Sequence, residues 1–286
     1  MLNKKQWFTE IHQDSSALSF KYKKTLFEGK SPFQTVKIIE TKSHGKMLIN
    51  EDIVMTCERD EFIYHEMIAH VPLFTHPHPK KALIIGGGDG GTAREILKHK
   101  KIKNCDLVEI DSMVVNACKK HLKSIGSAFN DPRLKIYFED GAAFIKNKKN
   151  HYDVIIVDSA DPIGPGKVLF ETPFYKNVFE ALKPDGLMTA QGESPLYEQK
   201  LQKTLLKTAG KIFPLAGFYN YGNLTYPGGV WSFLFASKKY HPIKDFKAGR
   251  VKNSAFSFRY YNKDIHQAAF SQPEFTKKNL GTLWKL

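Results

Sequence analysis

The spacing of hydrophobic and polar residues changes early in the chain and divides it into two regions. In the first region, apolar and polar side chains alternate over 18–22 and 34–38, and short apolar runs follow at 47–49 and 53–55. Alternation with a period of two is typical of a strand with one buried face. We therefore predict a small all-β domain over residues 1–57. So small a sheet needs further packing, so it should dock on the second region or on another subunit.

The second region is predicted to open with a helix. Over 58–70 an apolar stripe that includes Phe62 and Met67 recurs near helical spacing. Pro72 follows and is predicted to limit the end of the helix, because proline cannot donate a backbone hydrogen bond. We take residues 58–286 as the larger domain.

Strand and helix patterns then alternate. Short apolar runs predict strands, and amphipathic stretches between them predict helices. Such alternation is typical of a parallel sheet with helices on both faces, so we predict an α/β domain. The final strands should form an antiparallel hairpin, because a turn-rich segment joins them. The predicted strands are 82–85, 106–109, 134–138, 154–157 and 187–190, the helices 91–99, 112–122, 141–147, 171–182 and 195–211, and the hairpin strands 217–221 and 231–236.

A glycine-rich loop follows the first strand of the predicted parallel sheet. Gly86, Gly88 and Gly91 have the spacing of a dinucleotide-binding fingerprint, and Glu109 lies where that fingerprint places its ribose-binding acid. Asp89 does not fit this interpretation, because a carboxylate would repel a pyrophosphate at the start of a helix. The loop therefore indicates a nucleoside whose tail carries a positive charge.

Acidic residues recur at the carboxyl end of strand after strand. Ligands of an open parallel sheet bind beyond these ends. A single acid there is often only a helix cap, but capping does not explain five strands in succession. We therefore predict a carboxylate-rich cavity that selects a cationic ligand. The acids that follow the strands are Asp89, Glu109, Asp140, Asp158, Asp161 and Glu193.

Several of these acids have separable roles by position. Glu109 is placed to accept hydrogen bonds from both ribose hydroxyls, and Asp140 with Gly141 can bind an adenine edge. Asp158 and Asp161 lie in a stretch rich in proline and glycine, which could fold over the site as a lid. Each acid also has a structural alternative. Glu109 could be a solvated acid, Asp140 a helix N-cap, and Asp158 with Asp161 an Asx-turn pair. No histidine or cysteine cluster accompanies the acids in the sequence, so we predict no metal.

Composition limits the remaining classes of protein. The apolar runs are far shorter than the ~20 residues needed to cross a bilayer, and the start is polar without a signal-peptide core. Three cysteines form no metal-binding spacing, which favours a reduced, cytoplasmic protein. The net charge of +14 allows an anionic partner, but the lysines are dispersed over predicted helix faces and loops. We interpret them as a solvated basic surface, with neither nucleic acid nor membrane as a partner.

Five motifs together resemble those of the spermidine synthases, the polyamine aminopropyltransferases. The similarity extends over about residues 7–275, with the motifs in the family's order and spacing. A lone glycine-rich loop would be a weak signal, whereas five separate motifs are a strong one. The matching stretches are 58–66, 84–91, 158–165, 225–229 and 260–262.

The resemblance implies an enzyme. Its family transfers an aminopropyl group from decarboxylated S-adenosylmethionine to a diamine, usually putrescine, and releases spermidine and 5'-methylthioadenosine. The nucleoside is a co-substrate, so no cofactor is expected. The family's fold is a methyltransferase-like Rossmann sheet preceded by a small β domain, and its members form homodimers or homotetramers partly through the β domains.

The residues agree with this chemistry. Asp89 can bind the ammonium of the aminopropyl group and would repel the carboxylate of ordinary S-adenosylmethionine. One amine of the acceptor must be neutral to attack, and we predict Asp158 to orient it and to accept its proton as the N–C bond forms. Tyr64 could help to hold the attacking nitrogen. Asp161 and Glu193 are candidates for binding the distal ammonium.

Further roles are implied only by matching positions. Gln34 would reach the donor from the β domain, and Pro165 would contact the adenine. His65 would lie near the amine ends of the ligands. Lys167 departs from the family pattern, which has an acid there, and we expect its side chain to face solvent. The polyamine-binding positions would also include Ser159 and Ala160, with Tyr226 as a wall of the acceptor channel.

Three other functions compete with this one. A methyltransferase using ordinary S-adenosylmethionine is disfavoured by Asp89 and by the pair Asp158 and Asp161. A nicotinamide-dependent oxidoreductase fits the glycine spacing and not the charge of Asp89. A non-catalytic polyamine-binding module would have no need of Tyr64 and Tyr226 beside the acids.

Overall fold

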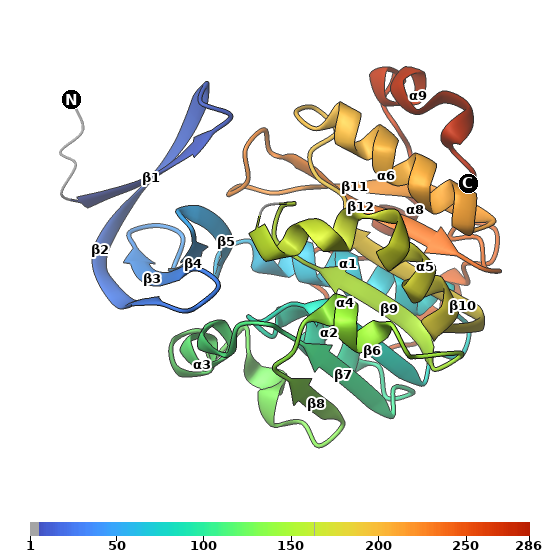
Figure 1. Ribbon diagram of the computed structural model, residues 1–286, viewed down its shortest axis with the longest axis horizontal. Helices are drawn as coiled ribbons and strands as arrows, with labels where there is room; N and C mark the ends of the chain where they lie inside the picture. Colours follow the sequence, from blue (N-terminus) through green and yellow to red (C-terminus); the bar gives the residue numbers. More distant parts are fainter. Residues whose placement is uncertain (1–5, 163) are drawn as a thin grey trace.

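Two β-sheets contain all the strands described by the computed structural model, which covers residues 6–162 and 164–286 (Figure 1). The first sheet is antiparallel and its strands follow sequence order. The predicted β-rich first region is therefore confirmed, but the prediction missed the first strand and shortened the second. The strands are β1 (Trp7–His12), β2 (Ser16–Lys30), β3 (Thr35–Thr41), β4 (Lys46–Asn50) and β5 (Ile53–Cys57).

The second sheet is mostly parallel, as predicted. Its order is β11-β12-β10-β9-β6-β7-β8, and only β12 runs antiparallel to its neighbours β10 and β11. Residues of the central strands are almost completely buried because helices cover both faces. The strands are β6 (Lys81–Gly86), β7 (Asn104–Val108), β8 (Leu134–Tyr137), β9 (Tyr152–Asp158), β10 (Leu182–Gln191), β11 (Leu215–Gly222) and β12 (Val230–Ser237).

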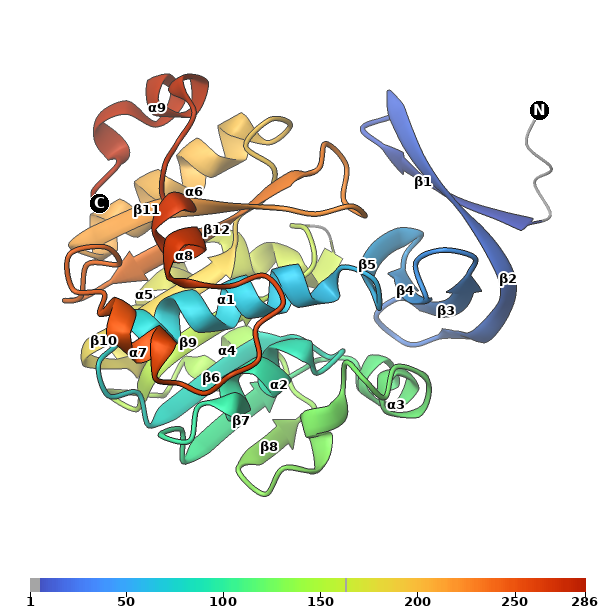
Figure 2. The ribbon, with the colours of Figure 1, turned by 180° about the vertical axis from the view of Figure 1, so that it is seen from behind.

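Helices form a layer on each face of this sheet. One core lies under α1 (Glu61–Thr75), α2 (Gly91–Lys98), α7 (Ala248–Lys252) and α8 (Lys263–Ala268), which Figure 2 shows in front. The opposite core lies under α4 (Gly141–Ile145), α5 (Thr172–Ala181), α6 (Gln199–Ile212) and α9 (Glu274–Leu280). The helices therefore cover both faces of the sheet, which leaves the ends of the strands as the places where a ligand could reach it.

Helix α3 (Ser112–His121) connects the two sheets. Its apolar residues Val114 and Val115 pack against Val36 and Ile38 of β3 in one buried cluster. The first sheet is therefore held beside the carboxyl ends of the parallel strands. This contact places residues of the first sheet at the site described below.

The prediction that α1 ends at Pro72 is wrong. The helix continues to Thr75, because Arg250 donates to the carbonyl oxygens of Leu73, Phe74 and His76 and satisfies groups that the helix end leaves free. The end of the helix is buried, so these contacts replace water. Pro72 itself costs only the one hydrogen bond its nitrogen cannot donate.

In the described part of the chain, no helix is both long enough and apolar enough to cross a membrane.

Candidate active site

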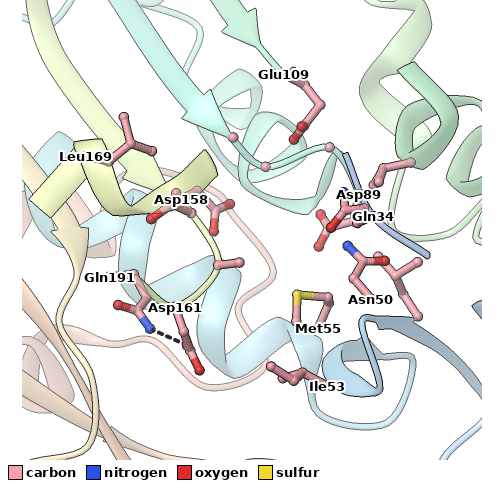
Figure 3. Close-up of a pocket in the computed structure, with 18 of the residues that line it drawn as sticks. Gln34, Asn50, Ile53, Met55, Asp89, Glu109, Asp158, Asp161, Leu169 and Gln191 are labelled. Carbon is pink, nitrogen blue, oxygen red and sulfur yellow. Dashed lines mark hydrogen bonds between the residues drawn. The ribbon is translucent and has the colours of Figure 1, made fainter. Parts of the chain in front are cut away.

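A cavity lies where the carboxyl ends of the parallel strands meet the first sheet (Figure 3). Gln34 and Asn50 reach it from the first sheet, while Glu109 and Asp158 reach it from β7 and β9. Most residues predicted to bind ligands line this cavity. They are Gln34, Tyr64, His65, Asp89, Glu109, Asp140, Gly141, Asp158, Ser159, Ala160, Asp161 and Tyr226.

The glycine-rich loop lets the backbone of β6 approach Asp158 closely. Gly86 has a φ of +83°, and a Cβ there would stand 2.1 Å from the carbonyl oxygen of Asp158. Gly87 has a φ of +67°, and its Cβ would stand 2.9 Å from the Asp158 carboxylate. Side chains are excluded at both positions by conformation and by space. The loop therefore presents only backbone atoms next to the Asp158 carboxylate.

Asp158 lies at the end of β9 with both carboxylate oxygens engaged by hydroxyl groups. Tyr64 donates to Oδ1 at 2.6 Å, and Thr92 donates to Oδ2 at 2.6 Å. Burial and the charge of Asp89 raise the pKa of Asp158, while His65 and the two hydroxyls oppose the increase. A carboxylate held in one orientation and made more basic is suited to accept a proton.

Asp89 and His65 form a second charged group on the other side of the loop. The Asp89 carboxylate accepts a hydrogen bond from Gly91 N at 2.7 Å and lies 3.4 Å from Nε2 of His65. Nδ1 of His65 lies 2.5 Å from Glu61, whose carboxylate binds Arg94 through both terminal guanidinium nitrogens, at 2.7 and 3.1 Å. A Cβ on Gly91 would overlap the imidazole ring, so this glycine makes room for His65.

Glu109 and Gln34 lie together at the end of the cavity next to the start of α3. Glu109 accepts from the backbone N–H of Asp111 at 3.0 Å. Burial raises its pKa to about 7, with a further increase from the charge of Asp111. Gln34 donates to Asp111 at 3.0 Å, and this contact ties the first sheet to the start of α3. The amide and the carboxylate thus face one space from two domains.

Asp140 combines a structural contact with a place in the cavity wall. Its carboxylate accepts from the backbone N–H groups of Ala142 and Ala143, at 2.7 and 3.0 Å, so it caps α4. Both Asp140 and Gly141 still line the cavity. A Cβ on Gly141 would stand 2.4 Å from Ile85, so only glycine allows the helix to start this close to β6.

A further group of acids lies at the far end of the cavity. Gln191 donates to Asp161 at 3.4 Å and to Glu193 at 2.9 Å, and the first of these bonds is drawn in Figure 3. Burial and then the charge of Asp161 raise the pKa of Glu193 to about 9. Glu193 does not itself line the cavity and lies buried behind Gln191. A cation bound beside these carboxyl groups would favour their ionised forms.

The aromatic wall of the cavity is held by contacts to both domains. Tyr226 donates to the carbonyl oxygen of Met55 in β5 at 2.7 Å. The preceding residue, Thr225, donates to Asp60 at 2.9 Å, so the loop between β11 and β12 is fixed near the start of α1. The Tyr64 and Tyr226 rings meet edge to face with their centroids 6.3 Å apart.

The turn-rich segment after β9 forms a short 3-10 helix, η3 (Gly164–Phe170), at the cavity edge. Gly166, Val168 and Leu169 line the cavity. Lys167 is exposed, in agreement with the expectation that it faces solvent. The predicted contact of Pro165 with adenine concerns a side chain outside the described part of the chain.

Three residues of the site were missed at the sequence level. Thr92 is the second residue of α2, and its sequence position shows only that it follows a glycine loop. Gln191 is the last residue of β10. Only acidic residues were considered at the strand ends from the sequence, so this amide was overlooked. Glu10 lies in the strand that was not predicted, and its carboxylate accepts from Val54 N at 2.8 Å beside the far acids. Burial raises the pKa of Glu10 to about 7.

One group of side chains elsewhere has the composition of a metal site. His76, Asp153 and Asp185 bring ligand atoms within 4.8 Å of one another at the opposite edge of the sheet. Asp153 already accepts two backbone N–H groups and the ammonium of Lys183. Nδ1 of His76 accepts from His78 N at 3.2 Å, which leaves the ring proton on the nitrogen a metal would need. These residues are poorly suited to a cation.

The fold and the cavity together define an α/β enzyme of the nucleoside-binding class. A glycine loop follows the first strand of a parallel sheet, and an acid at the end of the next strand faces the same space. The additional acids distinguish it from enzymes that bind anionic dinucleotides.

Comparison with known proteins identifies the family. Residues 61–248 match the spermine/spermidine synthase domain, and residues 6–58 match the spermidine synthase tetramerisation domain. A polyamine aminopropyltransferase of Alkaliphilus metalliredigens is 45% identical over 96% of this chain and 97% of its own. One from Methanocaldococcus jannaschii is 46% identical over 95% and 94%.

Solved structures agree with these matches. A spermidine synthase in complex with the transition state analogue AdoDATO superimposes with a TM-score of 0.96 at 42% identity, covering 98% of this chain and 96% of that one. The spermidine synthase of Thermotoga maritima gives 0.93 at 42% identity, covering 96% and 94%. The chain belongs to the spermidine synthase family of polyamine aminopropyltransferases, and it is an enzyme of that family.

Proposed function

We propose that the enzyme transfers the aminopropyl group of decarboxylated S-adenosylmethionine to putrescine, with spermidine and 5'-methylthioadenosine as products. The observation that carries this proposal is the position of Asp158. It is oriented by Tyr64 and Thr92 between one group of acids near the glycine loop and another at the far end of the cavity. The complex of a close structural relative with a transition state analogue supports an active site of this kind.

We assign the donor to the end of the cavity that contains the glycine loop. Glu109 would accept hydrogen bonds from the ribose hydroxyls, and Asp140 with Gly141 would bind the adenine edge. Gln34 closes this end from the first sheet. Asp89 would bind the ammonium of the aminopropyl group, which places the carbon next to sulfur toward Asp158.

The transfer is then a direct displacement. The neutral amine of putrescine attacks the carbon beside the sulfonium, the new N–C bond forms as the C–S bond breaks, and the bonding electrons leave with sulfur as an uncharged thioether. Asp158 takes the proton that the nitrogen loses. Removing a proton from an alkylammonium of pKa ~10.4 at neutral pH costs roughly 4–5 kcal/mol. The raised pKa of Asp158 brings its pKa closer to that of the amine, which makes the proton transfer less unfavourable.

The acceptor would extend from Asp158 toward the far acids. Its distal ammonium would lie near Asp161 and Glu10, with Glu193 buried and hydrogen-bonded to Gln191. Ser159, Ala160 and Tyr226 would form the sides of this channel, and His65 would lie near the amine groups of both ligands. That no metal or cofactor takes part remains a prediction. It is based on the lack of a histidine or cysteine cluster beside the acids in the sequence, and on the nucleoside being a co-substrate.

We also propose that the chain assembles as a homo-oligomer, with a tetramer as the more specific expectation. The match of residues 6–58 to a tetramerisation domain supports it. Strand β1 lies at an edge of its sheet and exposes Ile11, whose side chain is 68% accessible. An open strand edge with apolar side chains is suited to further packing. Light scattering on the full chain tests this, and the mass of a single chain would contradict it.

The function is tested by incubating the enzyme with decarboxylated S-adenosylmethionine and one acceptor at a time. Putrescine, cadaverine, spermidine and agmatine are compared, and the products are read by mass spectrometry. We expect methylthioadenosine and an acceptor enlarged by one aminopropyl group, with putrescine as the best acceptor. Methylated products with ordinary S-adenosylmethionine, or no product with any amine, would contradict the proposal.

Replacing Glu10 by glutamine should weaken binding of the acceptor. The amide keeps the hydrogen bond to Val54 N and removes one negative charge from the far acids. A hydrogen bond to a charged group contributes about 1.5–3 kcal/mol, so KM for putrescine should rise roughly 10- to 100-fold with kcat little changed. Steady-state kinetics at saturating donor measures this.

Glu28→Gln serves as the matched control, since Glu28 is an exposed acid on β2 away from the cavity. An unchanged KM in Glu10→Gln would place the distal ammonium elsewhere.

A further inference from the structure

We propose that His65 exchanges a proton for the ammonium group of the donor. In the free enzyme the ring is an imidazolium whose Nε2–H forms an ion pair with Asp89. When the aminopropyl ammonium binds beside Asp89, Nε2 gives up its proton and accepts a hydrogen bond from the ammonium instead. The inference rests on the proposed function, because it requires a donor whose tail is a primary ammonium.

The geometry of the two ring nitrogens carries the argument. Nδ1 lies 2.5 Å from a carboxylate oxygen of Glu61, and Nε2 lies 3.4 Å from a carboxylate oxygen of Asp89. A neutral imidazole has one N–H, so one of its nitrogens would point a lone pair at a carboxylate. Only 2% of the His65 side chain is accessible, so water cannot relieve that repulsion. The imidazolium satisfies both carboxylates.

The proton that leaves must come from Nε2. Glu61 is fixed as an anion by its paired contacts with Arg94, at 2.7 and 3.1 Å, and Arg94 also binds Glu95 at 2.8 Å. The hydrogen bond from Nδ1 to Glu61 is therefore retained in both states. Glu61 and Arg94 act as positioning residues, because they hold the ring so that Nε2 faces the cavity.

The carboxylates that face His65 from neighbouring elements favour an imidazolium in the free enzyme. Burial alone would lower the pKa of His65, but Asp89 in the loop and Glu61 on α1 outweigh it and raise the value to about 10. Asp158 on β9 interacts with His65 as well. The Arg94 guanidinium on α2 lies beyond Glu61. The Tyr64 ring contacts the imidazole edge to face, with centroids 5.4 Å apart.

Binding of an ammonium changes this balance. The ammonium has three N–H groups and can donate to Asp89 and to Nε2 at once, provided that Nε2 has a free lone pair. An imidazolium would instead repel the ammonium across a short distance in a buried site. The Nε2–H bond breaks with its electron pair left on nitrogen, and the proton passes to the buffer. The ammonium brings one positive charge beside Asp89 and His65 loses one, so the charge next to Asp89 is unchanged. The second positive charge of the donor, its sulfonium, is not compensated by this exchange.

Isothermal titration calorimetry tests the exchange on the intact enzyme. Binding is measured at roughly pH 8, between the ordinary pKa of histidine and the raised pKa of His65 in the free enzyme. Two buffers with different ionisation enthalpies then give the number of protons released. We expect decarboxylated S-adenosylmethionine to release about one proton more than methylthioadenosine, which has no aminopropyl ammonium.

Substitution assigns that proton to a residue. In His65→Gln the difference between the two ligands should disappear, and in His78→Gln, an exposed histidine, it should persist. Nitrogen chemical shifts of the wild-type imidazole test the same point without a variant. They should change from those of an imidazolium to those of a neutral ring protonated at Nδ1 when the donor binds.

The outcomes separate this inference from the proposed function. Equal proton release by the donor and methylthioadenosine, or an imidazolium that persists in the donor complex, would overturn the exchange and leave the function intact. Failure of both nucleosides to bind would overturn the function itself.

Discussion

Replacing Asp158 by asparagine is expected to lower kcat by ~10²- to 10⁴-fold, the usual contribution of a positioned general base. The amide oxygen can still accept one hydroxyl hydrogen bond, from Tyr64 or Thr92, so the local structure should persist. What is lost is the group that takes the proton from the attacking nitrogen. Single-turnover rates with donor and putrescine at saturation measure the effect directly.

Binding of the donor should be nearly unaffected by the same change, because Asp158 is proposed to contact the acceptor amine. The dissociation constant of methylthioadenosine provides this control. Asp264→Asn provides a second one, since Asp264 is an exposed acid on α8 whose side chain is 75% accessible. A turnover near the wild-type rate in Asp158→Asn would show that another group accepts the proton.

Replacing Asp89 by asparagine is expected to reduce discrimination between decarboxylated and ordinary S-adenosylmethionine by ~100-fold or more. Like charges brought together in a binding site cost several kcal/mol, and every 1.4 kcal/mol corresponds to a factor of ten. Asparagine keeps an oxygen for Gly91 N, whereas alanine would leave that N–H without its partner. The substitution therefore changes the charge and preserves the loop.

The effect should have two parts that a competition assay resolves. Affinity for decarboxylated S-adenosylmethionine should fall because its ammonium loses a carboxylate, and affinity for ordinary S-adenosylmethionine should rise because a repulsion is removed. Methylthioadenosine carries neither group and should bind as before. If the ratio of the two affinities does not change, a different group excludes the carboxylate.

The acids beyond the strand ends were predictable because, at a strand end, the position of a residue in the sequence also determines its position in the fold. Asp89, Glu109 and Asp158 each follow an apolar run, and parallel strands in one sheet bring their carboxyl ends to one edge. The charge mismatch at Asp89 was also readable from sequence, since it depends only on which residue lies within the glycine loop.

Contacts between distant segments were not predictable in the same way. Glu10 precedes Asp161 by about half the chain, and only the docking of the first sheet on α3 places it near the far acids. The relay from Asp89 through His65 and Glu61 to Arg94 crosses from the glycine loop to α1 and then to α2. Sequence spacing cannot predict which residues of two helices meet, because tertiary packing sets how the helices cross.

The sequence by itself determined the class of fold and the position of the glycine loop, and it predicted the sign of the ligand's charge. These follow from local periodicity and from side-chain chemistry at strand ends, which short-range physics controls. The tertiary structure decided which groups act on one another. It showed that the fifth glycine of the loop makes room for His65, and that Thr92 shares Asp158 with Tyr64. Such contacts depend on how helices and sheets pack in three dimensions, and the shifted pKa values of the buried acids arise from that packing.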